Sequence, residues 1–215
     1  ADLMGEGTTS MDFKTIARKV AAMGGEVNIA TGPNQTTISG SVLSEYGPEL
    51  VKILADIVMN PSFPASEIER LKNDLKRQLI VQKGVPQAQA LDKFRSIIYP
   101  DHAYGRIFPT IEMLDSYTME KIRSFYNDNF GAQRTVVYAV GKFDENEIAE
   151  AIKTSFGSWK EGPEVSYPPA DPKETNEVAI IDRANAPQTT IMLGLPTLDP
   201  SKPDYVPLSV TNSLL

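Results

Sequence analysis

His102 is the only histidine in this chain of 215 residues, and the sequence contains no cysteine. The lack of cysteine excludes thiol nucleophiles, disulfides and thiolate metal ligands. A single imidazole could act as a general base or as one metal ligand, but no glutamate or second histidine stands at helical ligand spacing from it. We therefore assign His102 no catalytic or metal-binding role.

Carboxylates are the other groups that could bind a metal or transfer protons. Asp2 and Glu6 could form such a pair near the start of the chain, but no third ligand is identifiable. Three more acids stand in one predicted helix, each three residues before a base: Glu67 with Arg70, Glu69 with Lys72, and Asp74 with Arg77. This spacing is typical of ion pairs on a solvated helix face, and we interpret these acids in that way.

Two further features are better explained by the fold than by a ligand. The pair Gly24-Gly25 lacks the lysine and the Ser/Thr of a phosphate-binding loop, so we interpret it as a helix end followed by a strand. Phe156 and Trp159 follow an amphipathic pattern, and we expect them to anchor the core.

The composition excludes several classes of function. Hydrophobic residues make up 41% and charged residues 23%, which is ordinary for a globular protein. The net charge is −7, and the bases are spread singly, so we expect no nucleic-acid partner. No apolar run approaches the roughly 20 residues of a membrane-spanning helix. Composition says nothing about chemistry beyond this.

Hydrophobic periodicity predicts alternating helices and strands. We expect helices over 11–23, 47–60, 65–83, 86–99, 110–116, 118–130, 144–159 and 203–215. Ser10, Thr118 and Asp144 are the predicted N-caps of the first, sixth and seventh. We expect strands over 26–32 and 35–43, joined as a hairpin, over 133–143 as a buried strand, and over 176–182 and 188–196.

These elements predict an α+β fold, an antiparallel sheet with helices packed on one face. Residues 1–162 would form the first domain in two layers. Prolines and acids crowd residues 163–175, which predicts a linker. Residues 176–215 would begin a second, similar domain.

Seven short motifs follow one another along the chain: GEGT, GGxVNxxT, NPSFPxxEIERLK, IYPDHAYG, TxExIxxFYxxxF, VYAVGKFD and FGSW. In this order they resemble the pitrilysin/insulinase family of zinc metallopeptidases, which includes the mitochondrial processing peptidases and many bacterial two-part enzymes. No single motif is specific, whereas the ordered set is. The resemblance covers almost the whole chain and implies the two-layer domain of processing peptidases.

The resemblance also implies an inverted zinc motif, His-x-x-Glu-His, just before the Gly-Thr turn, with a glutamate on a later helix as third ligand. Counted back from Gly7, the second histidine position is held by Asp2 and the general-base position by Ala1. The third ligand position falls on Gln78, whose neighbours supply no carboxylate. Alanine cannot accept a proton, and a carboxamide is a poor zinc ligand. We therefore expect no catalytic residue, metal or cofactor on this chain.

Members of this family are built from two similar halves that close as a clamshell around a peptide chamber, and commonly only one half carries zinc. The resemblance implies a catalytically silent half that docks with a zinc-bearing half, in the same polypeptide or as a separate subunit, and helps to hold a peptide substrate. Two alternatives stay open: a structural subunit like the core proteins of respiratory complexes, or an active zinc endopeptidase fragment with unrecognised ligands. Analogy with bacterial members points to the periplasm or cell envelope, but the sequence fixes no compartment.

We also expect the chain to be a segment of a longer polypeptide that lacks the family's opening strands. The first sheet would then expose an edge, and such edges recruit other strands. The predicted strands at 177–182 and 188–195 could fill this edge in the same chain or in a neighbouring copy, which would give a homo-oligomer.

Overall fold

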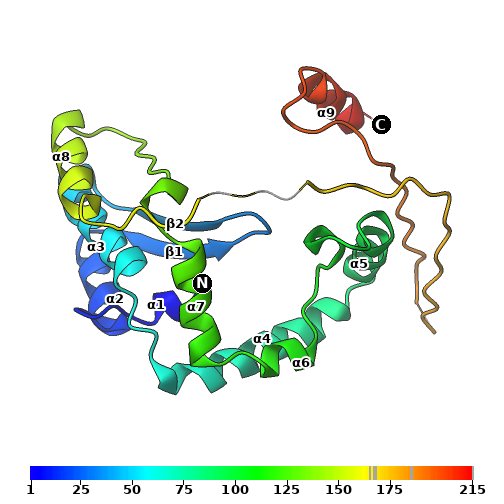
Figure 1. Cartoon of the computed structure of the whole chain (residues 1–215), viewed down its shortest axis with the longest axis horizontal. Coiled ribbons are helices and arrows are strands. Elements are labelled where there is room, and N and C mark those ends of the chain that lie inside the picture. The colour runs from blue at the N-terminus through cyan, green and yellow to red at the C-terminus, as the bar shows by residue number, and fades with distance from the viewer. Residues whose placement is uncertain (165, 167–168, 185, 215) are drawn as a thin grey trace. The chain divides into compact units, whose positions relative to one another are not determined.

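The structure is a computed structural model that describes residues 1–164, 166, 169–184 and 186–214 (Figure 1). Its elements are α1 (Asp2–Gly5), α2 (Phe13–Ala22), β1 (Glu26–Thr31), β2 (Thr36–Ser41), η1 (Ser44–Tyr46), α3 (Gly47–Met59), η2 (Ala65–Glu67), α4 (Ile68–Lys83), α5 (Pro86–Ile98), η3 (Ala103–Gly105), α6 (Ile111–Asp115), α7 (Met119–Asn129), η4 (Ala132–Arg134), α8 (Glu145–Phe156) and α9 (Tyr205–Leu214). The first compact unit contains Ala1–Gln78 and the described part of 110–167. The second contains Leu79–Pro109 and the described part of 168–215.

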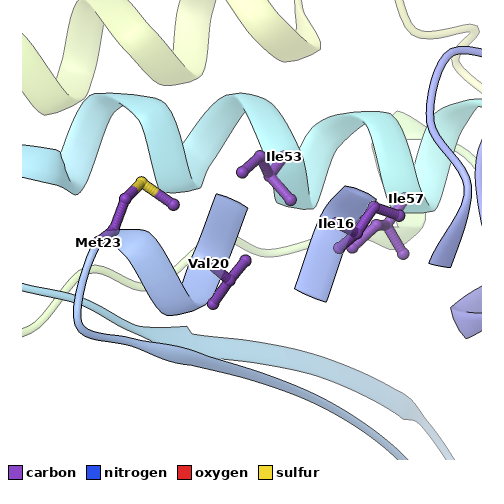
Figure 2. Packing of buried hydrophobic residues seen from close by; sticks show 5 residues of the cluster. All are labelled: Ile16, Val20, Met23, Ile53 and Ile57. Atoms are coloured by element: carbon purple, nitrogen blue, oxygen red, sulfur yellow. The ribbon is translucent and has the colours of Figure 1, made fainter. Parts of the chain in front are cut away.

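The sheet is an antiparallel hairpin in which Ile29 of β1 lies opposite Ile38 of β2. Side chains on one face of the hairpin are half-buried, while alternate residues such as Asn28 and Ser39 are exposed. Helices α2 and α3 cover the apolar face with one buried cluster, formed by Ile16, Val20, Met23, Ile53 and Ile57 (Figure 2). An antiparallel sheet with helices on one face confirms the predicted α+β class.

The ends of α2 show one correction to the sequence analysis. Asp12 caps this helix, because its carboxylate accepts a hydrogen bond from the Thr15 amide at 2.8 Å. The predicted cap, Ser10, instead donates its hydroxyl proton to Asp56 Oδ2 at 2.7 Å. The helix ends before Gly24 as predicted, and this glycine has a φ of 67°, which favours glycine.

A second buried cluster also includes a residue of α3. It consists of Leu3, Met4, Val58 and Phe63. Side chains from α7 and from the end of α8 pack against it, and Phe156 and Trp159 are among them, which confirms their predicted role as core anchors. Helix α3 thus contributes to both buried clusters of the first unit.

Tyr126 of α7 fixes the end of α3 within this second cluster. Its hydroxyl donates to the carbonyls of Val58 and Met59 at 2.6 and 3.1 Å, and its ring meets the Phe63 ring edge-on at a centroid distance of 5.4 Å. Phe63 is buried and adopts a φ of 47°, a conformation that bulky residues rarely adopt. Packing against Tyr126 therefore holds Phe63 in a strained backbone conformation.

The other three predicted strands are absent. Residues 135–140 form no strand and pair with none among the described residues, and Val136, Tyr138 and Val140 are exposed, so the prediction of a buried strand over 133–143 is wrong. The described residues of 176–182 and 188–196 also form no strand. Apolar and β-branched residues supply β propensity, but a strand also needs a hydrogen-bonded neighbour, which these segments lack here.

The second unit contains α5, η3 and α9. Two hydrogen bonds connect the later part of this unit to the two ends of α5. The amide of Lys173 donates to the carbonyl of Ile98 at 2.7 Å, and the side chain of Arg183 donates to the carbonyl of Gly84, just before α5, at 2.9 Å. None of the described helices combines the length and apolar character needed to cross a membrane.

Gly25→Ala should destabilise the protein by about 2–3 kcal/mol. A Cβ at this position would lie 2.0 Å from the carbonyl oxygen of Ser41, so the backbone would have to shift. In the matched control, Gly32→Ala, the nearest atom is the Gln35 carbonyl oxygen at 3.8 Å, and we expect a change within about 0.5 kcal/mol. Urea unfolding measures the stability of both variants. Equal transition midpoints would contradict the close packing of Gly25 against the Ser41 carbonyl.

Candidate functional site

The candidate site lies where α1 and the turn after it meet α3 and the start of α4. Helix α1 is a single turn, too short to be stable alone, and it is fixed by Leu3 and Met4, which are buried against Val58 and Phe63. This helix carries the first positions that the sequence analysis singled out, Ala1 and Asp2. Its placement therefore decides what surrounds them.

The turn after α1 is fixed by backbone hydrogen bonds. Gly7 has a φ of 135°, where a side chain would be strained, and its carbonyl accepts from both the amide and the hydroxyl of Ser62 at 3.0 Å. The amide of Thr9 donates to the carbonyl of Asn60 at 2.9 Å. The residues from Gly7 to Thr9 therefore lie against the chain that follows α3.

Thr8 organises this turn from within. Its side chain is buried, and its Oγ1 accepts from the amides of Ser10 at 3.2 Å and Met11 at 2.9 Å. The Thr8 amide in turn donates to the Met11 carbonyl at 2.7 Å. The Gly-Thr pair of the motif thus performs a structural function: it closes the turn that leads into α2.

Asp56 of α3 receives hydrogen bonds from this turn. Ser10 Oγ donates to Asp56 Oδ2 at 2.7 Å, and Asn60 Nδ2 donates to Asp56 Oδ1 at 2.9 Å. Partial burial opposes ionisation of Asp56, but hydrogen bonds from Ser10, Thr8 and Asn60 outweigh burial and lower its pKa. The carboxylate therefore stabilises the turn as an anion and is not suited to donate a proton.

An open depression of about 220 Å³ adjoins Asp56 between α3 and α8. Its lining residues are Lys52, Ala55, Asp56, Met59, Asn60 and Ser155. It combines one acid and one base with amide and hydroxyl groups but presents no imidazole, so it offers no donor set for catalytic zinc.

Ion pairs surround Arg70 at the start of α4. Its guanidinium contacts Glu67 and Glu6, each at 2.5 Å, and Asp74 at 3.2 Å. Asp74 also pairs with Arg77. The hydrogen bonds that Arg70 donates to Glu67 and then to Glu6 raise the pKa of its guanidinium above the ordinary value, so it stays charged.

The three helical pairs expected from the sequence are thus present, including that of Glu69 with Lys72 at 3.2 Å. The pairs of Glu6 with Arg70 and of Lys76 with Asp115 were missed, because they join residues far apart in the sequence.

The structure does not bring the singled-out residues together into a metal site. Asp2 and Gln78 are both exposed, and Glu6 is engaged by Arg70. His102 belongs to the second unit, where its Nδ1 accepts from the Tyr104 amide at 3.2 Å and its ring packs near Tyr99. Across the described ranges, no three Asp, Glu or His side chains lie close enough to hold a metal ion. The residues at the motif positions do not fit zinc.

Comparison with known sequences identifies relatives of both parts of the chain. Residues 2–108 match the family model described as "Insulinase (Peptidase family M16)", and residues 116–215 match "Peptidase M16 inactive domain". An uncharacterised zinc protease of Rickettsia felis is 30% identical over 190 residues, 88% of this chain and 45% of that protein. The mitochondrial-processing peptidase subunit beta of Dictyostelium discoideum is 27% identical over 148 residues, 68% of this chain and 32% of that protein. The chain spans about half the length of the first curated relatives that it matches.

Solved structures show the same fold. A peptidase M16 inactive domain from Pseudomonas fluorescens has a TM-score of 0.67 at 19% identity, with 77% of this chain and 41% of that chain covered. A protease from Helicobacter pylori has a TM-score of 0.70 at 17% identity, with 81% and 42% covered. At these identities the likeness concerns the fold alone.

Asp56→Asn should lower the free energy of unfolding by about 1 kcal/mol at pH 7, because the amide cannot accept charge-assisted hydrogen bonds. The pKa of Asp56 is lowered in the folded chain. Its carboxylate therefore stabilises the fold at pH values above its unfolded pKa, and this stabilisation is lost as the pH falls through the folded pKa. The difference between wild type and variant should therefore shrink towards pH 3 in urea unfolding.

The matched control for this prediction is Glu49→Gln on the same helix, whose carboxylate pairs with Lys52 at 3.7 Å on an exposed face. We expect its effect to stay below about 0.5 kcal/mol. A gap between wild type and Asp56→Asn that is constant between pH 7 and pH 3 would show that ionised Asp56 does not hold the turn.

Proposed function

This chain belongs to peptidase family M16, and on that basis we propose that it is a catalytically silent half of a zinc metallopeptidase. Its work is to dock with a zinc-bearing half, in the same polypeptide or as a separate subunit, and to form one wall of a peptide-enclosing chamber. We propose that residues 1–162 form the first domain of this half, 163–175 a linker and 176–215 the start of its second domain; the compact units divide the chain differently, since residues 79–109 belong to the second unit. Zinc belongs to the catalytic half.

One observation carries the proposal: the side chains at the positions of the family's motif cannot perform its chemistry. Ala1 stands where the general base is expected and has only a methyl group. Asp2 stands at an imidazole position, and Gln78 offers an amide in place of a carboxylate. A catalytic zinc site needs three protein ligands around one open position, and hydrolysis needs a base for the bound water.

Two further findings support it. The region that surrounds these positions is packed and hydrogen-bonded, since Leu3, Met4 and Thr8 are buried and Glu6 is held by Arg70. The match of residues 116–215 to an M16 inactive domain supports a scaffold role for that part of the chain. Loss of the catalytic groups with retention of the scaffold is what a docking half requires.

The zinc content of the purified chain tests this proposal. After dialysis against trace zinc, we expect elemental analysis to find far less than one zinc per chain, and we expect the chain alone to cleave none of a set of quenched fluorescent peptides. A motif-bearing M16 peptidase, treated identically, is the control and should hold about one zinc. A ratio near one for this chain would overturn the proposal and would make His102→Ala the next variant.

The two alternatives differ from the proposal in measurable ways. An active endopeptidase fragment would bind zinc and cleave peptides alone. For a structural subunit, the co-purifying M16 partner would also lack the motif. Cleavage that needs both chains, and that disappears when the motif glutamate of the partner is changed to glutamine, is expected only for a silent half.

We also propose that residues 135–140 recruit a strand from a second copy of this chain. The segment pairs with no strand in the described part of the chain, and Val136, Tyr138 and Val140 are 70%, 84% and 96% exposed. An exposed apolar run without a strand partner is a template for strand addition.

Sedimentation velocity should therefore show concentration-dependent dimerisation of the wild-type chain. Val137→Pro should weaken this association at least about tenfold, because proline cannot donate a hydrogen bond to a neighbouring strand. Val137→Thr keeps both the amide and the β propensity and should behave like wild type. A chain that stays monomeric at every concentration, or equal association of both variants, would contradict strand addition.

A further inference from the structure

Helix α4 passes from the first compact unit into the second, with the boundary after Gln78. Leu79 is its only buried residue, and it lies on the second unit's side of that boundary. Within the first unit, Ile68 and Leu71 are half-buried against the core. Apolar burial therefore holds this part of α4 weakly compared with α3, which buries five side chains.

Charged contacts add to this weak apolar attachment at two places. Arg70 pairs with Glu6, which lies just after α1, and Lys76 pairs with Asp115 at the end of α6. Lys72 Nζ also donates to the carbonyl of Asp115 at 3.3 Å. In the described part of the chain, these two ion pairs are the ones that join different elements, whereas the others join residues three or four apart within a helix region.

We propose that these contacts form a salt-sensitive clamp that holds α4 on the first unit, and we call Glu6, Arg70, Lys72, Lys76 and Asp115 the α4 clamp. A single exposed ion pair contributes little. Three contacts on one weakly buried helix act together, and the Debye length shortens from roughly 10 Å at 0.1 M salt to roughly 3 Å at 1 M. High salt therefore loosens residues 69–78 while the two buried clusters that include α3 stay closed.

The α4 clamp controls the attachment of α4 to the first unit, and this inference does not depend on the proposed function. Helix α4 is one of the segments that lead from the first unit into the second. The α4 clamp thus sets how firmly the chain entering the second unit is fastened to the first. Its strength responds to ionic strength and to any charged partner that competes for Arg70 or Lys76.

Hydrogen exchange of the full chain, followed by mass spectrometry at 20 mM and 1 M NaCl, tests the clamp. We expect exchange in residues 69–78 to rise about three- to tenfold at high salt. Peptides from α3 provide the internal reference and should not change. If the exchange rate of residues 69–78 changes no more with salt than that of the α3 peptides, the proposal is overturned.

Charge-reversal variants distinguish loss of the α4 clamp from a loss of helix stability within α4. Lys76→Glu and Asp115→Lys should each raise exchange in residues 69–78 at low salt, and the double variant should restore it. Arg77→Gln is the matched control, because it removes a pair within α4 and leaves the clamp intact. If Arg77→Gln has the effect of Lys76→Glu, or if the double variant is not restored, salt acts on helix stability and the clamp is refuted.

Discussion

The first unit depends on α3, which contributes buried side chains to both of its apolar clusters. Ile53 and Ile57 close the core against α2 and the hairpin, and Val58 lies in the core formed with α1 and α7. A helix with one apolar face can hold one neighbour, whereas a helix that contributes to two clusters joins them. The turn after α1, the cap of α2 and the strained Phe63 all take their places relative to this helix.

Much of the fold could be predicted because its signals are local. Helix periodicity, the cap at Asp144 and the hairpin from 26 to 41 each depend on residues close in sequence. The strand predicted over 133–143 failed because pairing depends on a neighbour elsewhere. The N-cap of α2 was misassigned for a similar reason. Ser10 is a suitable N-cap residue, but its hydroxyl donates to Asp56, which lies 46 residues away, and Asp12 is the N-cap instead.

The candidate site could be predicted in part. Counting along the motifs assigned Ala1, Asp2 and Gln78, but the sequence could not show that Glu6 meets Arg70 across 64 residues. In the described region, the acids near the motif helix act as hydrogen-bond acceptors and ion-pair partners of the scaffold. Asp56 and Glu6 illustrate the same principle: a carboxylate surrounded by donors is stabilised as an anion and becomes part of the architecture.

The interleaving of the two units along the chain has a consequence for biosynthesis. Leu3, Met4 and Val58 are synthesised early, but the α7 and α8 side chains that cover them emerge only after residues 79–109 of the second unit. At roughly 5–20 residues per second, this delay amounts to several seconds. The cluster formed by the hairpin, α2 and α3 can therefore close first. The cluster that contains Leu3, Met4 and Val58 is completed only when the side chains of α7 and α8 have been synthesised.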